Sequence, residues 1–493
     1  MLGSFLDSAA TRFPGKVALI CEGESVTYRE LDSRVTALAR WLLDQGLRPG
    51  DRVAIHWLNS IPAVQVFMAC FRAGLIVVPI NARLKPLEVA YILEHARPGI
   101  YFCQPELSAI AVEAQSGLAA QPRFCTALPA PDESRPDNLP EVDADRPALI
   151  LYTSGTTARP KGVVHTHRSI HACAKLTEFV DLGESDTVLL MTSVMHASGV
   201  FVQMVPGLIV GATIVLIPAF QAAAVLDAAE RHNCTWSAAL PTMLQFVLEE
   251  QAARPRRTGF RTFIAGGDTV PLALHERFQQ LFGMPVLELF GMTESVPTCS
   301  NLKNARRPGS IGRLLGSVEA RIVGLTGRDL SDGEIGEMAV RSPGNFIGYW
   351  NDPVETAAAL ESGWLMTGDL VRRDGDGYFW FEGRKKQIIV RGGANISPQE
   401  VEEALYQHPA VLEAGVIGLP DPVYGERVVA FVTLRPGKVV AEQELREFAQ
   451  KRLSDHKVPE RIEFLEALPK GPTGKVQRRA LKEMASGRPA VKN

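Results

Sequence analysis

Hydrophobic and polar positions follow two alternating periods along the first 145 residues. Apolar residues recur at helical spacing over residues 28–46, and Gly46 is suited to end that helix. Apolar runs at 51–56 and 75–79 predict strands, with a helix over 63–73 between them. Strand, helix and strand in this order predict a parallel sheet that is covered on both faces.

The same rhythm continues after a Pro- and acid-rich stretch at 128–145, which predicts a linker between subdomains. Strands are predicted at 148–152, 187–191, 212–217 and 262–265, and the apolar run 205–219 is interpreted as a buried strand with its turn. Residues 375–383 predict a hairpin strand, and a charged connector follows it. The remaining residues, with a helix at 399–406, a strand at 428–432 and a helix at 442–451, suffice for a small α/β domain.

The bulk properties exclude several classes of protein. The chain has 493 residues, which is too many for one compact core. Its net charge of -3 lacks the positive excess that is typical of nucleic-acid-binding domains. Seven scattered cysteines without a CxxC pair argue against structural zinc and disulfides and favour a reducing cytosol. The run 205–219 is shorter than the roughly 20 residues that span a bilayer. We therefore predict a soluble, cytoplasmic protein without a transmembrane segment; the oligomeric state, including a homodimer, stays open.

The most informative segment is 151–162, which is rich in hydroxyls and cations and follows the predicted strand 148–152. A loop of this composition can cradle a triphosphate, since Gly155 allows close approach and Lys161 supplies a compact positive charge. It differs from the Walker A pattern, because Pro160 precedes the lysine and Gly162 follows it. A Ser/Thr/Gly-rich surface loop is the alternative interpretation. The candidate cradle consists of Thr153, Ser154, Gly155, Thr156, Thr157 and Lys161.

Five further segments follow this loop in a fixed order: 289–295, 367–369, 383–386, 391–395 and 471–475. Together the six segments resemble the adenylate-forming superfamily of acyl-CoA synthetases, peptide-synthetase adenylation domains and luciferases. The resemblance covers nearly the whole chain, from residues 27–31 to Lys475. It implies an α/β fold: a large N-terminal domain (1–383) of α/β subdomains with a β-rich subdomain, a hinge (384–387), and a small mobile α+β C-terminal domain (388–493).

The nucleotide would be held by residues from most of these segments. Glu294 is a hard oxygen donor suited to Mg²⁺, with Thr156 as a second ligand, although Glu294 could also be a solvated acid. Asp369 can accept both ribose hydroxyls, and Arg384 can help from the hinge side; either could instead be an ordinary turn residue. The resemblance places Thr293 at the phosphate and the following residues around the adenine: Gly266, Gly267, Asp268, Glu288 and Phe290. Gly291 is a further predicted nucleotide-binding residue.

Two lysines and a histidine complete the candidate site. The resemblance implies that Lys475 reaches the carboxylate and the α-phosphate. The alternative interpretation is that Lys475 is one of several solvated basic residues at the start of a helix around Arg478. His196 matches the family's histidine at the acyl site. The resemblance also implies that Lys386 takes the pivot position of the hinge, and that rotation there would bring Gly392 and Gly393 to the site for the thiol arm.

Other catalytic arrangements are disfavoured. Ser154 and Ser198 lack the G-x-S-x-G frame, and the spacing of His165, His167 and His171 does not favour a metal site. Departures from the family's pattern are Ala158, Phe290 and Ala394, and none removes a catalytic group.

The sequence therefore predicts an ATP-dependent acyl-CoA synthetase that uses ATP, Mg²⁺ and coenzyme A. The expected acyl pocket lies near 196–201, Thr242, 265–268 and 291–297, which are small or apolar, so a medium- or long-chain fatty acid or another uncharged acid is favoured. Alternatives are an aryl-acid CoA ligase, an adenylating ligase that loads a carrier protein, an oxidising luciferase-like enzyme, and a nucleotide-binding scaffold without turnover.

Overall fold

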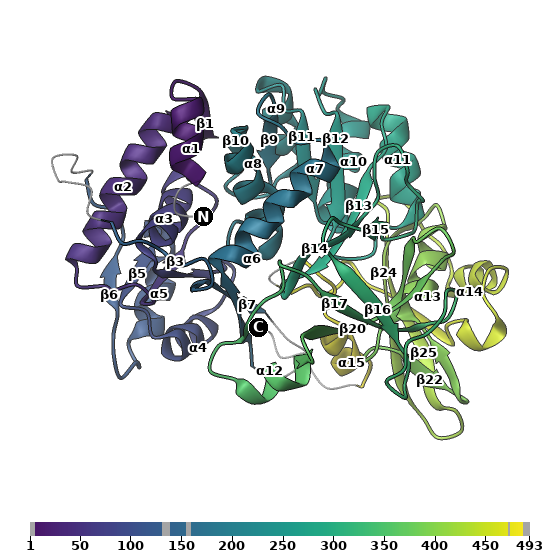
Figure 1. The fold of residues 1–493 in the computed structure, drawn as a ribbon. Helices are drawn as coiled ribbons and strands as arrows, with labels where there is room; N and C mark the ends of the chain where they lie inside the picture. The colour runs from purple at the N-terminus through teal and green to yellow at the C-terminus, as the bar shows by residue number, and fades with distance from the viewer. Residues whose placement is uncertain (1–4, 131–138, 154–158, 472–473, 487–493) are drawn as a thin grey trace.

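Four β-sheets and the helices around them make up the part of the protein that the structure describes (Figure 1). The computed structural model describes residues 5–130, 139–153, 159–471 and 474–486. Two large sheets and a smaller β-rich sheet form the part up to Arg384, and the fourth sheet belongs to the C-terminal part. The α/β fold with a β-rich subdomain and a small C-terminal α+β part is confirmed.

The first large sheet has seven strands in the order β18-β8-β7-β4-β3-β5-β6. Five neighbouring strands are parallel, as predicted, whereas at one edge β8 pairs antiparallel with β7 and β18 pairs antiparallel with β8. The strands are β3 (Arg52–His56), β4 (Ile76–Ile80), β5 (Ile100–Cys103), β6 (Arg123–Cys125), β7 (Pro147–Thr153), β8 (Lys161–Thr166) and β18 (Gly348–Tyr349). Their helices are α2 (Tyr28–Asp44), α3 (Ile61–Ala73), α4 (Pro86–Ala96) and α5 (Ser108–Gln115).

The second large sheet has nine strands in the order β15-β14-β13-β12-β11-β9-β10-β1-β2. It is parallel in the middle and antiparallel at both edges. The strands are β1 (Val17–Cys21), β2 (Glu24–Thr27), β9 (Thr187–Leu190), β10 (Thr213–Leu216), β11 (Trp236–Ala239), β12 (Thr262–Gly266), β13 (Leu287–Met292), β14 (Ser295–Ser300) and β15 (Arg313–Leu314). The helices are α1 (Phe5–Arg12), α6 (His167–Ala172), α7 (Leu176–Val180), α8 (Val205–Val210), α9 (Ala222–Arg231), α10 (Pro241–Ala253) and α11 (Leu272–Phe282).

The helix α3 joins the two large sheets into one core. Nearly all of its residues are buried, and they belong to the same apolar cluster as strands of both sheets. A helix that is apolar all round is stable only when neighbours cover every face. Both large sheets therefore pack against the same buried helix and share one apolar core.

The interpretation of 205–219 as a strand with its turn is wrong in its first half. Residues Ser198–Met204 form a π-helical turn that continues into α8, and only then does β10 begin. Pro206 lies in the first turn of α8, where its missing N–H costs little, and Gly211 ends the helix in the left-handed conformation (φ 84°). A buried helix and a buried strand give the same continuous apolar run, so the sequence pattern could not separate them.

The third sheet is antiparallel, in the order β16-β17-β20-β19, with β21 beside β20. Its strands are β16 (Glu319–Val323), β17 (Gly336–Arg341), β19 (Leu360–Glu361), β20 (Trp364–Arg373) and β21 (Phe379–Arg384), and the short helix α12 (Pro353–Ala359) precedes it. The predicted hairpin strand at 375–383 corresponds to β21.

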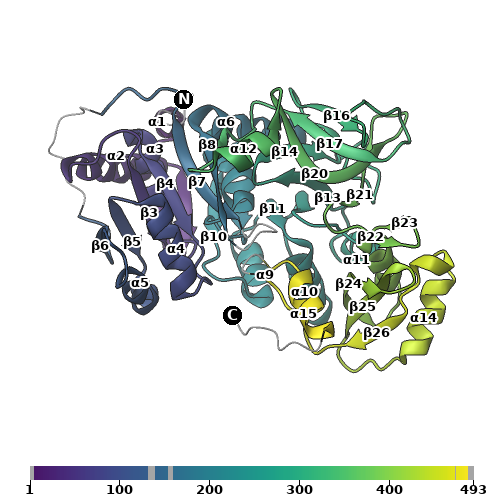
Figure 2. The same cartoon turned by 90° about the horizontal axis from the view of Figure 1, so that it is seen from below.

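The C-terminal part has its own sheet and its own apolar cluster. Figure 2 shows it at one side of the molecule, next to the third sheet. Its strands are β22 (Ile389–Arg391), β23 (Ala394–Ile396), β24 (Val411–Asp421), β25 (Gly425–Leu434) and β26 (Arg461–Phe464), and its helices are α13 (Pro398–Tyr406), α14 (Glu442–Gln450) and α15 (Arg478–Ala485). The predicted helices and the strand of this region are confirmed, while the exact domain boundaries stay predictions.

Polar contacts connect the C-terminal part to the larger one. Arg435 forms an ion pair with Glu249 on α10, and Glu403 accepts a hydrogen bond from the N–H of Leu272 at 3.1 Å. Between the parts, Lys385, Lys386 and Gln387 form a turn after β21. Within the described ranges, no helix has both the length and the apolar character needed to cross a membrane.

Candidate active site

The candidate phosphate loop connects two paired strands. Thr153, the last residue of β7, lies opposite Lys161, the first residue of β8. Ser154, Gly155, Thr156 and Thr157 lie outside the described residues, so the structure places only the two ends of the cradle. The ammonium of Lys161 forms an ion pair with Glu355 on α12 and lies 4.9 Å from the centre of the Tyr349 ring.

Glu294 lies in the tight turn between β13 and β14, where Met292 pairs with Ser295. Its side chain is largely buried, and its Oε1 accepts a hydrogen bond from the hydroxyl of Tyr349 at 2.9 Å. Burial and the charge of Glu294 raise the pKa of Tyr349, so the tyrosine stays protonated and donates. Thr293 is fixed through its carbonyl oxygen, 2.7 Å from Nε2 of His165. His165 therefore supports the turn that carries Glu294.

Charged groups from distant segments converge at the edge of β20. Nε of Arg384, at the end of β21, lies 3.2 Å from Oδ1 of Asp369. Burial raises the pKa of Asp369 to about 6, against the opposing charges of Arg384 and Lys475. The nearby carboxylates of Glu294 and Asp268 raise it further. These groups therefore share one electrostatic environment.

Lys475 from the C-terminal part lies within this cluster. Burial lowers its pKa, and the charge of Arg384 acts in the same direction, while Asp268, Asp369 and Glu294 oppose both effects. A partly desolvated ammonium beside several carboxylates remains available to a polyanion, because no single carboxylate neutralises it. The structure thus brings Lys475 to the residues that were predicted to hold the nucleotide.

His196, the residue predicted at the acyl group, lies close enough to Lys475 to feel its charge. Desolvation lowers its pKa to about 4, and the charge of Lys475 contributes. The imidazole is therefore neutral at neutral pH. It precedes the π-helical turn Ser198–Met204, where Gly199 is required because a Cβ atom there would lie 2.2 Å from the carbonyl oxygen of Ser193.

The residues predicted at the adenine lie on β12, β13 and the loop after β12. Gly266 allows these strands to approach, because its Cβ would lie 2.1 Å from the carbonyl oxygen of Leu289; Gly267 has a positive φ of 84°. Phe290 packs against Phe381 with ring centres 6.3 Å apart.

The carboxylate of Glu288 is bound by other groups of the protein. Its Oε1 lies 2.8 Å from Nε2 of His275 and accepts a hydrogen bond from the N–H of Gly309 at 3.0 Å. Burial raises its pKa. A contact with adenine stays a prediction for Glu288, and nucleotide binding stays a prediction for Gly291.

Gly392 and Gly393 form the turn between β22 and β23, with φ of 58° and 82°. The turn is exposed, and the N–H of Gly392 donates to the carbonyl oxygen of Tyr424 at 2.8 Å. In this arrangement Lys475, rather than the glycine turn, lies beside the charged cluster. The predicted second orientation stays a prediction.

The donor set fits Mg²⁺ held mainly by phosphate oxygens. Glu294 offers a buried carboxylate with one hydroxyl donor on Oε1, and no group of three metal-binding side chains occurs among the residues that the structure describes. Mg²⁺ commonly uses one or two protein carboxylates and completes its shell with water and phosphate. Thr156, the second predicted ligand, lies outside the described residues.

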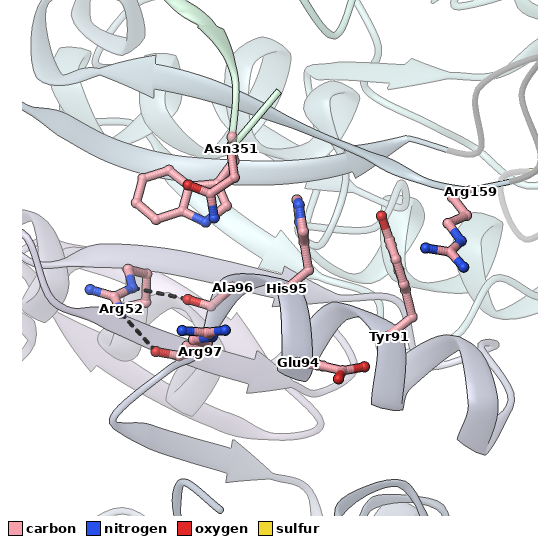
Figure 3. A pocket seen from close by; sticks show the side chains of 9 residues that line it. Arg52, Tyr91, Glu94, His95, Ala96, Arg97, Arg159 and Asn351 are labelled. Carbon is pink, nitrogen blue, oxygen red and sulfur yellow. Dashed lines mark hydrogen bonds between the residues drawn. The ribbon is translucent and has the colours of Figure 1, made fainter. Parts of the chain in front are cut away.

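A cavity of about 670 Å³ lies between α4 and the chain around Asn351 (Figure 3). It is lined by Arg52, Tyr91, Glu94, His95, Ala96, Arg97, Arg159, Trp350 and Asn351. Arg52 donates to the carbonyl oxygens of Ala96 and Arg97, at 3.0 and 2.9 Å, so its charge already caps the end of α4. None of the predicted catalytic residues lines this cavity.

Sequence reasoning missed Tyr349 and Glu355. Both lie outside the six segments, and their partners Glu294 and Lys161 are distant in the chain. Only the run Gly348-Tyr-Trp350, two aromatic residues after a glycine, gave a local signal.

Known proteins share both the sequence pattern and the fold. A profile of AMP-binding enzymes matches residues 6–350, and a profile of the C-terminal domain of these enzymes matches residues 400–475. The chain belongs to this family of AMP-binding enzymes, within the adenylate-forming superfamily.

Individual relatives align over almost the full length. A sulfoacetate–CoA ligase from Cupriavidus necator is 35% identical, covering 97% of this chain and 96% of its own, and a feruloyl-CoA synthase from an Amycolatopsis species is 36% identical, covering 96% and 97%. An anthranilate–CoA ligase solved with anthranoyl-AMP superposes with a TM-score of 0.93 at 27% identity, covering 99% of this chain and 98% of that one.

Proposed function

We propose that this protein is an ATP-dependent carboxylate–CoA ligase. A carboxylate oxygen attacks the α-phosphorus of ATP, the bond to pyrophosphate breaks, and acyl-AMP forms. The thiol of coenzyme A then attacks the acyl carbon, loses its proton and displaces AMP. The family membership and the CoA ligases among the relatives support this reaction.

The observation that carries the proposal is the convergence of Lys475 with Glu294, Asp369 and Arg384. The substrate carboxylate is itself the nucleophile, so adenylation needs positioning and charge stabilisation rather than a general base. Lys475 can stabilise negative charge between the carboxylate and the α-phosphate. Asp369 can accept the ribose hydroxyls, since a carboxylate has two acceptor oxygens.

Glu294, together with Thr156, would hold Mg²⁺. The ion would neutralise part of the phosphate charge when bound. Lys161 and the loop after Thr153 would bind the leaving pyrophosphate. The neutral imidazole of His196 can donate one hydrogen bond to the acid but adds no positive charge at neutral pH, so the charge of the carboxylate is compensated by Lys475.

An uncharged fatty or aryl acid is the proposed substrate class. The residues around His196 are buried and apolar, namely Val194, Met195, Ala197, Val200 and Phe201, and residues 194–204 contain no lysine or arginine. A second carboxylate or a sulfonate would need a cation there. The relatives' names do not select a class, because ligases for sulfoacetate and for ferulate are about equally similar.

The first test measures AMP and pyrophosphate release from ATP and Mg²⁺ with a panel of fatty, aryl and dicarboxylic acids, each with and without coenzyme A. Catalytic AMP release that requires CoA supports the ligase, and the best acid identifies the class. Pyrophosphate released to about one equivalent of enzyme, whether or not CoA is present, would favour an acceptor such as a carrier protein. No release with any acid would contradict the proposal.

A further inference from the structure

Tyr349 lies where the two candidate phosphate-binding groups of the larger part meet. It belongs to β18, whose register sets Tyr349 opposite Val163 of β8. Its hydroxyl donates to Oε1 of Glu294 at 2.9 Å, and the Lys161 ammonium lies 4.9 Å from its ring centre. One side chain therefore contacts both the predicted metal ligand and the predicted pyrophosphate-binding cation.

The ring of Tyr349 is itself held in place. Phe346 packs against it edge-to-face with centres 4.9 Å apart. The N–H of Tyr349 donates to the hydroxyl of Thr356 at 2.8 Å, and the N–H of Phe346 donates to the carbonyl oxygen of Glu294 at 2.8 Å. The segment 346–349 is thus tied to the turn that carries Glu294 by both its backbone and its side chain. Because its neighbours hold the ring in place, the ring restricts the positions of the Glu294 and Lys161 side chains that it contacts.

The two contacts suit different tasks. A hydroxyl donor to a buried carboxylate restricts the rotamers of that carboxylate. An aromatic face attracts an ammonium group without neutralising its charge, so Lys161 can still bind a phosphate. A carboxylate such as Glu355, by contrast, competes with phosphate for the same lysine.

We propose that Tyr349 is a positioning residue for adenylation, whose hydroxyl holds Glu294 in the orientation that accepts Mg²⁺ and whose ring supports Lys161. This inference rests on the proposed function. It adds a residue to the site that lies outside the six segments noted in the sequence. Tyr349 acts through Glu294 and Lys161 and does not need to touch the reacting atoms.

The test is Tyr349→Phe, which removes the hydroxyl and keeps the ring. The dissociation constant of α,β-methylene-ATP, which cannot release pyrophosphate, is measured by calorimetry with EDTA and with excess Mg²⁺. The ratio of the two constants reports how strongly the metal and the nucleotide are coupled. We expect Tyr349→Phe to reduce this ratio about tenfold, the usual size of one hydrogen bond to a charged group. Glu294→Gln should abolish most of the coupling.

A matched control is Tyr378→Phe. Tyr378 donates its hydroxyl to the carbonyl oxygen of Ala305 at 2.7 Å, and it has no assigned role in the site. It should retain the wild-type ratio. In kinetic assays the Mg²⁺ concentration for half-maximal adenylation should rise about tenfold in Tyr349→Phe, and the rate should recover at high Mg²⁺. A structural defect alone would lower the rate at every Mg²⁺ concentration.

Tyr349→Leu separates the second contact, because it removes the ring as well. It should raise the ATP KM a further two- to fivefold beyond Tyr349→Phe, the usual size of a cation–π contact. Wild-type coupling in Tyr349→Phe would overturn the role of the hydroxyl, and equal ATP KM values in the two variants would overturn that of the ring. A wild-type enzyme without ligase activity that still binds the analogue would contradict the proposed function alone.

Discussion

Lys161 and Lys475 are both expected to meet phosphate, but the protein holds them by different means. Lys161 begins a strand of the large sheet, and its partners Tyr349 and Glu355 belong to the same part of the protein. Lys475 follows Gly474 (φ 83°) in the loop before α15, and the carboxylates near it, Asp268 and Asp369, belong to the other part.

The difference separates two kinds of catalytic group. The position of Lys161 follows from the packing of one core, so it is present whenever that core is folded. The position of Lys475 depends on how the C-terminal part is oriented, and a modest change of interface contacts can remove it from the site. Variants of the two regions should therefore differ in which half-reaction they impair.

The largest expected effect is that of Lys475→Ala. Acyl-AMP formation should slow by about 10²–10³-fold, because one preorganised charge at the developing phosphate charge is lost. Thioester formation from supplied acyl-AMP should remain, because that step does not use this lysine in the two-orientation scheme. Rapid-quench assays of each half-reaction measure the two rates separately.

Lys482→Ala is the matched control, because Lys482 is exposed on α15 in the same terminal segment. It should leave both half-reactions unchanged. Equal losses of both half-reactions in Lys475→Ala would remove the distinction between the two lysines.

Asp369→Asn tests the cluster that faces Lys475 and should have opposite effects on binding and on stability. The ATP KM should rise about tenfold, because a charged acceptor for the ribose hydroxyls becomes neutral. The pKa of Asp369 is raised from 3.8 to about 6, mainly by burial. Proton uptake therefore stabilises the fold fully below about pH 4, and this stabilisation is lost as the pH rises through about 6.

The stability of the variant relative to wild type should accordingly increase with pH. Asp369→Asn should gain up to about 3 kcal/mol over wild type at pH 8 and clearly less near pH 4.5, as measured by urea unfolding. Asp376→Asn serves as the control, because Asp376 is an exposed carboxylate in the turn between β20 and β21. A stability difference that does not depend on pH would show that folding leaves the pKa of Asp369 unchanged.

Arg435→Ala weakens the contact between the two parts without touching the site. Arg435 and Arg277 both bind Glu249, so the glutamate keeps one partner when Arg435 is removed. Adenylation should slow about twofold to fivefold, the range for a partly exposed ion pair, because Lys475 spends less time in the cluster. Thioester formation should be unchanged or faster.

Stopped-flow measurement of the two half-reactions checks this expectation. Arg461→Ala is the control, since Arg461 pairs with Glu463 within the C-terminal sheet at 2.9 Å. If Arg435→Ala slows both half-reactions alike, the contact stabilises the fold and does not select an orientation.

The sequence predicts individual helices and strands better than the contacts between segments that are distant in the chain. The helix at 28–46 and the strands at 51–56 and 75–79 follow from local periodicity, and the structure has them as α2, β3 and β4. The run 205–219 failed because burial on all sides removes the periodicity that separates a helix from a strand. Local pattern thus identifies elements wherever one face remains polar.

The site shows the same limit at a longer range. Glu294, Asp369 and Lys475 were found through motifs, and the structure brings them together. The contacts of Tyr349 with Glu294 and of Lys161 with Glu355 join positions 55 and 194 residues apart. No periodicity carries such a pairing, because it depends on which sheet edges and loops the complete fold places side by side.

The smallest expected effect concerns the ion pair of Lys161 with Glu355. The Glu355 side chain is 41% exposed. Phosphate must displace this carboxylate before it can bind the ammonium. Glu355→Gln removes the competing charge, so the ATP KM should fall about twofold, as expected for an exposed ion pair. Initial-rate measurements of pyrophosphate release over a range of ATP concentrations test it.

Glu361→Gln is a suitable control, because it removes an exposed carboxylate of the same region that is not paired with Lys161. The comparison of the two lysines requires that Glu355→Gln changes ATP binding and leaves the use of supplied acyl-AMP untouched. A higher ATP KM in Glu355→Gln would mean that the carboxylate positions Lys161 for phosphate. Lys161 would then depend on a charged partner in its own part of the protein, as Lys475 depends on charged groups in the other.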